Sequence, residues 1–288
     1  MPDGVSSTMA GFRVTVVIPC FNHGVFLPEA LDSVVKLDRA DVEIIVVDDG
    51  STDIETPKAL EVAEARGVRV IRQKNGGLAA ARNAGIAASR GEYIFPLDAD
   101  DKVRSGWIER ATDMLDSQPR LGVVYGDAEC FGCLTGTWRV GPFSAEHLLR
   151  ENFIHASALY RRVIWEQNGG YDGTMPVQGL EDWDFWVGAF ERGWQFVYIP
   201  TIFFEYRQAP GSMIVRARGY AEAVEEFVAK KHGPLYREAW LQQGNQQQSV
   251  RFVARQLGDL LKLRLKQKCG IHNGGPAFGK PGSARAEG

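Results

Sequence analysis

Four short apolar segments alternate with three segments of helical periodicity in the first hundred residues of the chain. The apolar segments are rich in Val and Ile and end at turn residues, which is typical of strands buried in a parallel sheet. Parallel strands need crossover helices, so the alternation predicts an α/β fold whose central sheet is mostly parallel. The expected strands are 13–19, 42–47, 68–72 and 93–97, and the expected helices are 25–36, 56–66 and 78–89.

Clusters of acidic residues follow two of these strands. Asp48 and Asp49 come directly after the second strand, and Asp98, Asp100 and Asp101 come after the fourth. The carboxyl ends of neighbouring parallel strands meet at one edge of a sheet, where ligands bind. Crowded carboxylates repel one another, and a divalent cation that also binds a substrate phosphate relieves the repulsion. The sequence therefore predicts a crevice that holds a metal ion and a phosphate-bearing ligand.

The second half of the chain is less regular. A third acidic cluster, Glu181-Asp182, lies at the start of an aromatic-rich helix expected at 182–192. The other expected helices are 107–117, 143–150, 161–168, 220–232 and 251–268, and the expected strands are 122–125 and 196–199. Gly, Pro, Lys and Ala dominate from residue 270 onward, which is typical of a disordered tail.

Composition limits the class of protein. Hydrophobic residues make up 44% of the chain and the net charge is −3, as expected of a soluble globular protein that does not bind nucleic acid. No apolar run approaches the roughly 18–20 residues of a membrane span, and residues 1–11 lack a signal-peptide core. We therefore expect a cytoplasmic protein. Cys130 and Cys133 have the spacing of half a zinc site, but no second pair completes it, so reduced thiols are expected.

Five motifs occur in order between residues 13 and 213. They are Val17-Ile18-Pro19-Cys20-Phe21-Asn22, Val47-Asp48-Asp49-Gly50-Ser51-Thr52-Asp53, the segment from Asn75 to Gly85, the Asp98-Ala99-Asp100 triplet and Glu181-Asp182-Trp183-Asp184-Phe185-Trp186. The series closely resembles family 2 glycosyltransferases, which have the GT-A fold. One such motif is common by chance, whereas five in the same order are not.

The resemblance implies an enzyme that moves a sugar from a nucleoside diphosphate to an acceptor hydroxyl and inverts the anomeric carbon. Departure of the charged diphosphate is then expected to need Mg²⁺ or Mn²⁺ as a Lewis acid. By the family pattern Asp100 binds the metal, and Asp98 lies near the metal and the ribose. Residues two apart in an extended segment point the same way, so both carboxylates can face the ion. The acceptor is expected to be a glycan, a lipid-linked molecule or another hydroxyl compound.

The same resemblance assigns donor-nucleotide binding to residues of the first half. They are Pro19, Phe21, Asp49, Asn75, Arg82 and Asp98. A carboxylate at Asp49 can accept the N3–H of uracil or thymine, which favours a UDP- or dTDP-linked donor; its alternative role is to cap a turn or a helix. Arg82 reaches phosphate or base with its planar fork, or it is a surface arginine. Phe21 is either a base contact or a core residue.

The acceptor side is assigned to the start of the aromatic-rich helix. By the family pattern Asp182 is the general base that takes the proton of the attacking hydroxyl. Glu181 is expected to support the base or to bind the acceptor, although acids at this place also stabilise a helix N-terminus. Trp183 and Trp186 form an acceptor platform or belong to the core, and Asp184 is expected to face another way.

A downstream segment, Tyr206 to Met213, resembles the family loop that closes over the diphosphate. Arg207 and Ser212 are its expected phosphate contacts. The family pattern usually has His where this chain has Gln208, so the chain departs from the pattern there. His155 is expected to be a structural histidine rather than a catalytic one.

The resemblance also suggests how the chain is divided. Residues 1–12 are expected to be a flexible N-terminus, 13–101 the nucleotide-sugar-binding half of a GT-A domain, and 102–219 its acceptor-binding half. C-terminal helices at 220–268 and a disordered tail at 269–288 follow.

The expected helix at 251–268 has six basic residues and one acid, with leucines interleaved. It therefore either packs its leucines on the catalytic domain or contacts an anionic membrane surface peripherally, at the inner face of the membrane.

Two other classes use a similar arrangement of acids. A non-catalytic sugar-nucleotide or glycan-binding domain shares the fold, but such a domain has little need of both Asp100 and Asp182. A nucleotidyltransferase also uses paired acids and Mg²⁺. A Gly-rich basic loop usually follows the first strand of such enzymes, however, and residues 19–24 contain neither Lys nor Arg. Both classes remain alternatives to the glycosyltransferase.

Overall fold

The computed structural model describes residues 11–209 and 218–242. The chain divides into two compact units, residues 1–235 and residues 236–288. The sheet and the candidate site belong to the first unit. Ser212 and the expected helix at 251–268 lie outside the described residues.

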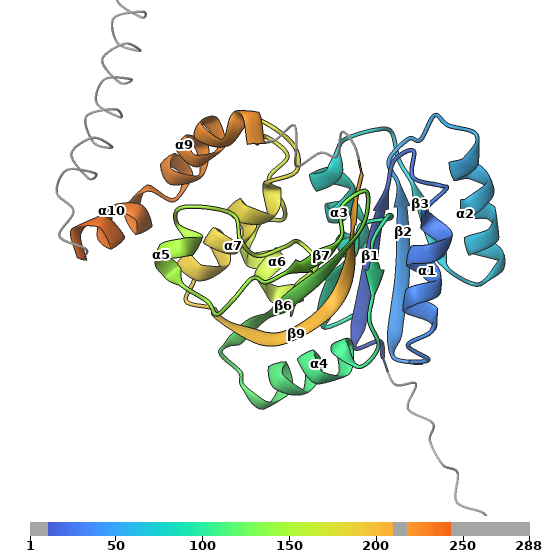
Figure 1. Cartoon of the computed structure of the whole chain (residues 1–288), viewed down its shortest axis with the longest axis horizontal. Helices are drawn as coiled ribbons and strands as arrows, with labels where there is room; N and C mark the ends of the chain where they lie inside the picture. Colours follow the sequence, from blue (N-terminus) through green and yellow to red (C-terminus); the bar gives the residue numbers. More distant parts are fainter. Residues whose placement is uncertain (1–10, 210–217, 243–288) are drawn as a thin grey trace, which may run out of the picture. The chain divides into compact units, whose positions relative to one another are not determined.

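The seven elements expected between residues 13 and 97 are all present, with ends that differ by at most two residues. They are β1 (Val14–Cys20), α1 (Leu27–Val35), β2 (Val42–Asp48), α2 (Glu55–Ala65), β3 (Arg69–Arg72), α3 (Leu78–Ala87) and β4 (Tyr93–Pro96). The four strands pair in parallel in the order β3-β2-β1-β4 (Figure 1). The α/β fold and the parallel sheet predicted for this half are confirmed.

Strand β1 passes through Pro19 and ends at Cys20, one residue beyond the expected end. The carbonyl of Val17 faces β4, because it accepts the amide N–H of Leu97 at 3.0 Å. Pro19 faces the same side, where the pairing with β4 has already ended at Val17. Its missing N–H therefore costs no ladder hydrogen bond, and the strand carries Phe21 to the carboxyl edge of the sheet.

Beyond β4 the sheet becomes mixed. Its remaining strands are β8 (Leu159–Arg161), β6 (Leu121–Gly132), β9 (Gln195–Gln208), β5 (Lys102–Val103) and β7 (Gly136–Trp138). β8 is antiparallel to β4 and β6, β5 is antiparallel to β9, and β7 is antiparallel to β6, whereas β6 and β9 run parallel. The expected strands at 122–125 and 196–199 are the starts of β6 and β9. The observed strands continue further, past polar residues such as Asp127 and Glu205, which interrupt the apolar runs on which the expected ends were based.

Helices cover both faces of the sheet (Figure 1). Val46 of β2 belongs to the large core cluster that includes residues of α1, α2 and α4 (Trp107–Ser117). Its neighbours Ile45 and Val47 pack against Ala81 of α3 instead. Successive side chains of a strand point to opposite faces, so α3 lies on the face opposite α1, α2 and α4.

Helix α3 approaches the sheet closely through Gly85. A Cβ atom at this position would lie 2.4 Å from Cγ1 of Val17 and 3.1 Å from Cγ2 of Val47, so only glycine fits without a shift of the strands. Arg82 lies three residues earlier, on the same side of the helix. The close packing therefore brings the Arg82 side chain against the carboxyl edge of the sheet.

The remaining described helices are α5 (Ala145–Leu148), α6 (Arg162–Asn168), α7 (Glu181–Glu191), the 3₁₀ turn η1 (Arg218–Tyr220), α9 (Ala221–Lys231) and α10 (Gly233–Gln242). α5 is shorter than the helix expected at 143–150, and the Ser144 hydroxyl caps its start by accepting the N–H of His147 at 3.2 Å. No helix of the described residues is long and apolar enough to cross a membrane.

Helix α7 packs on β8 through aromatic side chains. The ring of Tyr160 lies 5.1 Å from Phe185 and 5.6 Å from Trp186, between ring centroids. Leu159, the neighbour of Tyr160 in β8, joins the core on the α4 face. α7 thus covers the same face of the sheet as α3, and an ion pair between Arg82 and Glu181 joins the starts of the two helices.

Candidate active site

The candidate active site lies at the carboxyl edge of β1 and β4, beside the starts of α3 and α7. The chain turns sharply after β4, where the N–H of Asp101 donates to the carbonyl of Asp98 at 3.0 Å. Asp98 and Asp100 are half-buried, and Asp101 is fully buried. The predicted crowding of carboxylates at this edge is therefore present in the structure.

Arg82 joins this turn to α7. Its guanidinium donates to Asp98 from Nη2 at 2.8 Å and to Glu181 from Nη1, and the side chain is only 2% exposed. Its Nε has no hydrogen-bond partner among the described residues. The alternative of a surface arginine is therefore wrong. The expected contact with phosphate or base stays a prediction, because the guanidinium is already held by two acids.

The acids of the turn differ in proton affinity. Burial favours the neutral form of Asp98, but the Arg82 guanidinium outweighs this effect and the pKa of Asp98 is lowered. Burial and the neighbouring Asp98 raise the pKa of Asp100. Burial, together with Asp100 and Asp98, raises the pKa of Asp101 well above its usual value. The turn is thus a place where added positive charge is strongly favoured.

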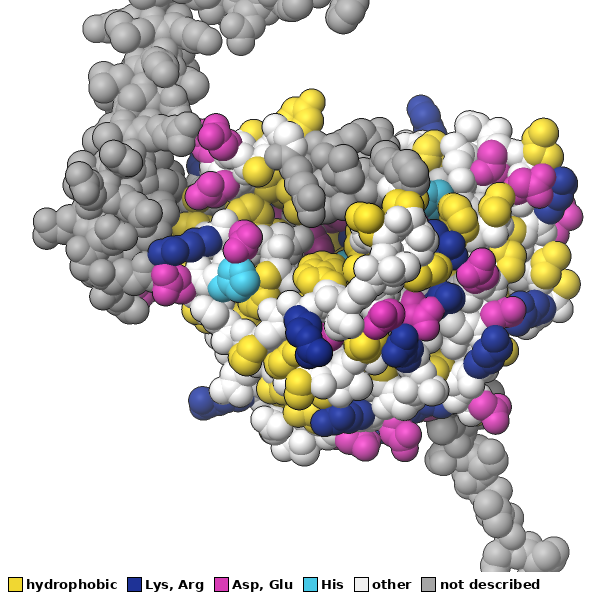
Figure 2. Space-filling model, viewed as in Figure 1, with side chains coloured by type: hydrophobic (Ala, Val, Ile, Leu, Met, Phe, Trp, Pro, Cys, Tyr) yellow, Lys and Arg dark blue, Asp and Glu magenta, His cyan; other side chains and the backbone are white. Residues whose placement is uncertain are grey.

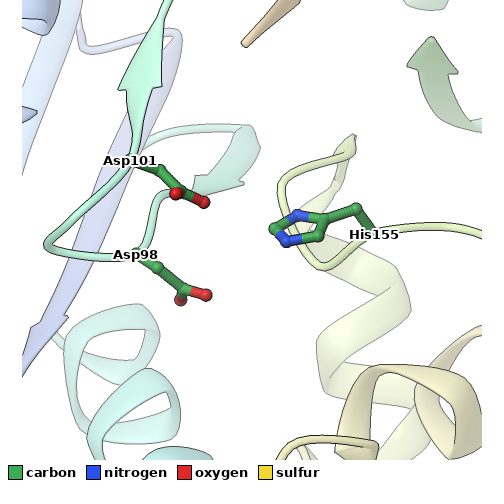
Figure 3. A group of neighbouring side chains, drawn as sticks. All are labelled: Asp98, Asp101 and His155. Atoms are coloured by element: carbon green, nitrogen blue, oxygen red, sulfur yellow. The ribbon is translucent and has the colours of Figure 1, made fainter. Parts of the chain in front are cut away.

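A possible cation position lies between Asp98, Asp101 and His155. One potential ligand atom from each lies within 4.8 Å of the others, and Figure 3 shows both carboxylates pointing toward the imidazole ring. Oδ1 of Asp101 accepts the N–H of Arg207 at 2.8 Å, but Oδ2 is buried and has no hydrogen-bond partner among the residues that the structure describes. Carboxylate oxygens of this kind suit Mg²⁺ or Mn²⁺. Two carboxylates, one with a buried unpaired oxygen, therefore fit a divalent ion.

Asp100 lies outside this group of three. Its carboxylate instead lies 3.8 Å from Nδ1 of His23, and its side chain is 21% exposed. The expected ligands were Asp98 and Asp100, and that assignment stays a prediction. Asp101 was not among the ligands expected from the sequence, although it belongs to the same acidic run.

His155 itself is a poor metal ligand as it is placed. Its ring is packed against Phe204 and Tyr206, at centroid distances of 4.6 and 5.0 Å. Burial lowers the pKa of His155 to about 4, so the ring is neutral at pH 7. The N–H of Ser157 donates to Nδ1 at 3.0 Å, which leaves the single ring proton on Nε2. The carboxylates are therefore the better ligands.

Asp182 stands at the start of α7 and is 7% exposed. Its Oδ1 accepts the side-chain N–H of Asn152 at 2.9 Å and the backbone N–H of Trp183 at 3.0 Å. Burial, followed by the charge of Glu181, raises the pKa of Asp182 to about 7. A carboxylate with this pKa is well matched to accept a proton near neutral pH.

The other residues of the same helix turn have structural partners. Glu181 accepts the N–H of Gly179 at 2.7 Å in addition to the Arg82 pair, so both of its oxygens are occupied. Trp183 is 4% exposed and donates its indole N–H to the carbonyl of Leu148 at 2.6 Å. These contacts favour the core role for Trp183 over the acceptor platform.

Trp186 and Asp184 also have partners away from the acidic turn. Trp186 is fully buried and donates to the carbonyl of Ile154 at 3.1 Å, which makes it a core residue. Asp184 bonds to Lys231 at 2.7 Å and to His232 at 3.1 Å, both on the segment that ends α9. Asp184 thus faces another way from Asp182, as expected.

The donor-nucleotide candidates lie at the ends of β1 and β2. Asp49 is 3% exposed and accepts three hydrogen bonds, from the Gln73 side chain at 2.7 Å and from the N–H groups of Gly76 and Gly77 at 2.8 Å each. The carboxylate therefore holds the 73–77 loop, in line with its alternative capping role. Its contact with a base stays a prediction.

The neighbouring candidates differ in exposure. Pro19 is buried and Asn75 is exposed. Phe21 is 45% exposed, which excludes the core alternative and leaves its ring available for a ligand. Asp48 accepts the N–H of Ser51 at 2.9 Å and so caps the turn after β2.

Arg207 supports the acidic turn from β9. Its backbone N–H donates to Asp101, and its Nε donates to the carbonyl of Asp100 at 3.0 Å. The guanidinium lies over the rings of Phe26 and Phe131, at 4.5 and 4.4 Å from their centroids, and Nη2 reaches Glu29 at 2.9 Å. Arg207 therefore fixes the turn, and its predicted phosphate contact stays untested.

The comparisons with known proteins agree on one family. The family model described as "Glycosyl transferase family 2" matches residues 15–177. The chain is 31% identical over 236 residues to the uncharacterized glycosyltransferase EpsJ of Bacillus subtilis (strain 168), with 76% of this chain and 67% of that protein covered. It is 30% identical over 188 residues to the PGL/p-HBAD biosynthesis glycosyltransferase of Mycobacterium bovis (strain BCG / Pasteur 1173P2), with 64% and 72% covered.

A solved structure shares the fold. The crystal structure of S. aureus TarS 1-349 in complex with UDP-GlcNAc superposes with a TM-score of 0.61 at 18% identity. The match covers 76% of this chain and 66% of that chain, so the chain spans just under two thirds of the TarS fragment. At this identity the likeness concerns the fold alone.

Proposed function

The chain belongs to glycosyl transferase family 2 and is a glycosyltransferase with the GT-A fold, and we propose that it moves a sugar from a nucleoside-diphosphate sugar to an acceptor hydroxyl with inversion. The observation that carries the proposal is the link between the start of α7, where Asp182 lies, and the acidic turn after β4. Asp182, with a pKa of about 7, directly follows Glu181, and the buried Arg82 ties Glu181 to the acidic turn at Asp98.

In the proposed reaction Asp182 accepts the proton of the acceptor hydroxyl as that oxygen attacks the anomeric carbon. The new carbon–oxygen bond forms on the face opposite the diphosphate, and the bond from the anomeric carbon to the diphosphate oxygen breaks. The electron pair of the broken bond leaves with the nucleoside diphosphate. Glu181 and Arg82 hold Asp182 and the acidic turn in a fixed relative position, so that the attacking hydroxyl and the leaving diphosphate lie in line.

A divalent cation completes the proposal. Asp98 and Asp101 are the residues that would hold it, with Asp100 as the ligand predicted from the family pattern. When bound, Mg²⁺ or Mn²⁺ supplies Lewis-acid stabilisation of the charge on the leaving diphosphate. The buried, unpaired Oδ2 of Asp101 supports this part of the proposal.

The donor is proposed to be UDP- or dTDP-linked. The UDP-GlcNAc complex of TarS, a protein of the same fold, supports a uridine donor. In this proposal Pro19 and the exposed ring of Phe21 contact the nucleobase of the donor, together with Asn75 and Asp49. Arg207 and Ser212 are the proposed contacts of the diphosphate.

The acceptor is proposed to be a glycan or a lipid-linked molecule, which the name of the PGL/p-HBAD biosynthesis relative supports. Residues 13–101 then form the donor half and 102–219 the acceptor half. We place the protein in the cytoplasm, with peripheral membrane contact through 251–268 as a further proposal. We propose no nucleic-acid partner; on the one face shown in Figure 2, Lys and Arg side chains are scattered among Asp and Glu.

A panel of nucleotide sugars tests the proposal. The purified chain is incubated with each sugar, a set of glycan and lipid-linked acceptors, and Mg²⁺ or Mn²⁺, and the released phosphate species is identified. We expect nucleoside diphosphate and a product with inverted anomeric configuration. Release of pyrophosphate would point to a nucleotidyltransferase. Binding of a nucleotide sugar with no turnover on any acceptor or on water would point to a non-catalytic domain.

A further inference from the structure

Asn152 lies between α5 and β8, and its side chain makes a single hydrogen bond within the described part of the chain. Its Nδ2 donates to Oδ1 of Asp182 at 2.9 Å. Its own Oδ1 is buried and has no hydrogen-bond partner among the described residues. No motif of the sequence includes this residue.

The orientation of the amide follows from its partner. If Oδ1 and Nδ2 were exchanged, the amide oxygen would face an oxygen of the Asp182 carboxylate, and the two would repel. With the amide as placed, the N–H favours the ionised form of Asp182, which is the form able to accept a proton. The same contact leaves Oδ2 of Asp182 without a partner in the described part of the chain.

The other groups around Asp182 act on its charge in both directions. Glu181 and Asp98 disfavour the ionised carboxylate, and Arg82 favours it. Tyr171 and Tyr206 also face this cluster of charges. Apart from the backbone N–H of Trp183 in its own helix, Asn152 is the one hydrogen-bond donor to Asp182 among the described residues.

The donor contact with Asp182 is what points to a functional role for Asn152. A buried carbonyl group with no donor destabilises the folded state, and among the described residues Asn168 has such a group as well, so the unpaired oxygen alone does not mark a functional residue. An apolar side chain of the same size would avoid this cost. It would also remove the donor from Asp182.

We propose that Asn152 is the positioning residue of the base: it fixes one oxygen of Asp182 and keeps the carboxylate ionised, so that the other oxygen faces the acceptor hydroxyl. The proposal rests on the proposed function, in which Asp182 is the base. It adds a residue from the loop before β8 to the machinery and explains why a buried amide is left half-paired there.

The test replaces Asn152 with leucine, which has nearly the same size and shape. Asn168 of α6 offers a matched control. Its Nδ2 donates to the carbonyl of Phe185 in α7 at 2.9 Å, and its Oδ1 is also buried without a partner among the described residues. The pKa of Asp182 is measured by NMR titration of ¹³C-labelled aspartate carboxyl groups, with the signal assigned by its loss in Asp182→Asn. Nucleoside diphosphate release from the best donor, with water as acceptor, is followed against pH.

Loss of one hydrogen bond to a carboxylate should raise the pKa of Asp182 by roughly one unit in Asn152→Leu. At pH 7 turnover should then fall about fivefold, and the deficit should shrink as the pH rises and be nearly gone by about pH 9, where the base is ionised in both proteins. The melting temperature should not fall. Asn168→Leu should leave the pKa and the pH profile unchanged.

The proposal is overturned if Asn152→Leu leaves the pKa of Asp182 unchanged, or if Asn152→Leu and Asn168→Leu shift it equally. A fall in melting temperature without a change in the pH profile would also overturn it, because that is the signature of a purely structural residue. Failure of the proposed function looks different. Asp182→Asn would then keep its turnover, whatever the titration of Asn152→Leu shows.

Discussion

Replacement of Arg82 by methionine tests whether this buried cation holds the two halves of the site together. The change keeps the length and apolar character of the side chain but removes the charge. Asp98 and Glu181 would then face each other without a cation, and Glu181 has only a 3% exposed side chain. Removal of one partner from a buried ion pair typically costs about 3–5 kcal/mol. Asp98 keeps 28% exposure and some solvent screening, so we expect the lower part of that range.

The assay is thermal unfolding followed by circular dichroism at several pH values. A loss of about 3 kcal/mol corresponds to a fall in melting temperature of roughly 6–12 °C for a chain of this size. The loss should depend on pH. The pKa of Asp98 is lowered in the folded state. The contribution of the ionised Asp98 to folding stability is therefore present above its pKa in the unfolded chain and is lost as the pH falls through its pKa in the folded protein. Wild type and Arg82→Met should therefore converge at acid pH.

The matched control is Arg66→Met, which breaks a pair with Asp32 whose side chains are 36% and 50% exposed. Exposed pairs contribute about 0–1 kcal/mol, so this variant should melt close to wild type. If Arg82→Met were no less stable than Arg66→Met at pH 7, the buried Arg82 pairs would not be what joins α3, α7 and the acidic turn.

Three further predictions concern the metal, a buried histidine and the C-terminal segment. Asp101→Asn should weaken Mn²⁺ binding, measured by electron paramagnetic resonance, by about tenfold or more, because ligation by a carboxylate is lost; unchanged affinity would remove Asp101 from the ligand set. Burial lowers the pKa of His232, but its bonds to Asp184 and Glu191 outweigh this and raise the pKa overall. The stability that His232 contributes is complete below its pKa in the unfolded chain and is lost as the pH rises through its pKa in the folded protein. His232→Gln should therefore lower the melting temperature more at pH 6 than at pH 8.5. An equal loss at both pH values would refute the reasoning. If residues 251–268 bind membranes, the chain should co-sediment with anionic vesicles in a salt-sensitive manner, and truncation at Ser249 should abolish this; no binding at low salt would exclude the role.

The first half of the fold was predictable because β1 and β4 are buried on both faces and most of β2 is buried as well. Continuous apolar runs such as Val42 to Val47 leave little ambiguity, and Gly67 marks where a helix ends. The second half was harder to predict because β6 and β9 continue past polar residues, where pairing with neighbours rather than local sequence keeps the strand extended.

The candidate site was predictable in its residues but not in their partners. Arg82 belongs to a recognisable motif, yet its ion pairs lie 16 and 99 residues away along the chain. The three bonds that occupy Asp49 likewise come from residues 24–28 positions later. Asn152 has no local signal at all, because its role depends on a contact with Asp182 that only the fold creates.

Asp182→Asn is the most direct test of the account. The amide has almost the same shape as the carboxylate but cannot accept the proton of the acceptor, so turnover should fall by roughly 10² or more. Asp184→Asn is the control, since it neutralises a buried acid two residues along the same helix that is bonded to Lys231 and His232. Donor affinity, measured by calorimetry, should stay near the wild-type value in both. A loss of turnover in Asp182→Asn with donor binding intact and Asp184→Asn active is the result we predict. Near wild-type turnover in Asp182→Asn, or lost donor affinity with turnover preserved, would contradict the assignment of Asp182 as the base.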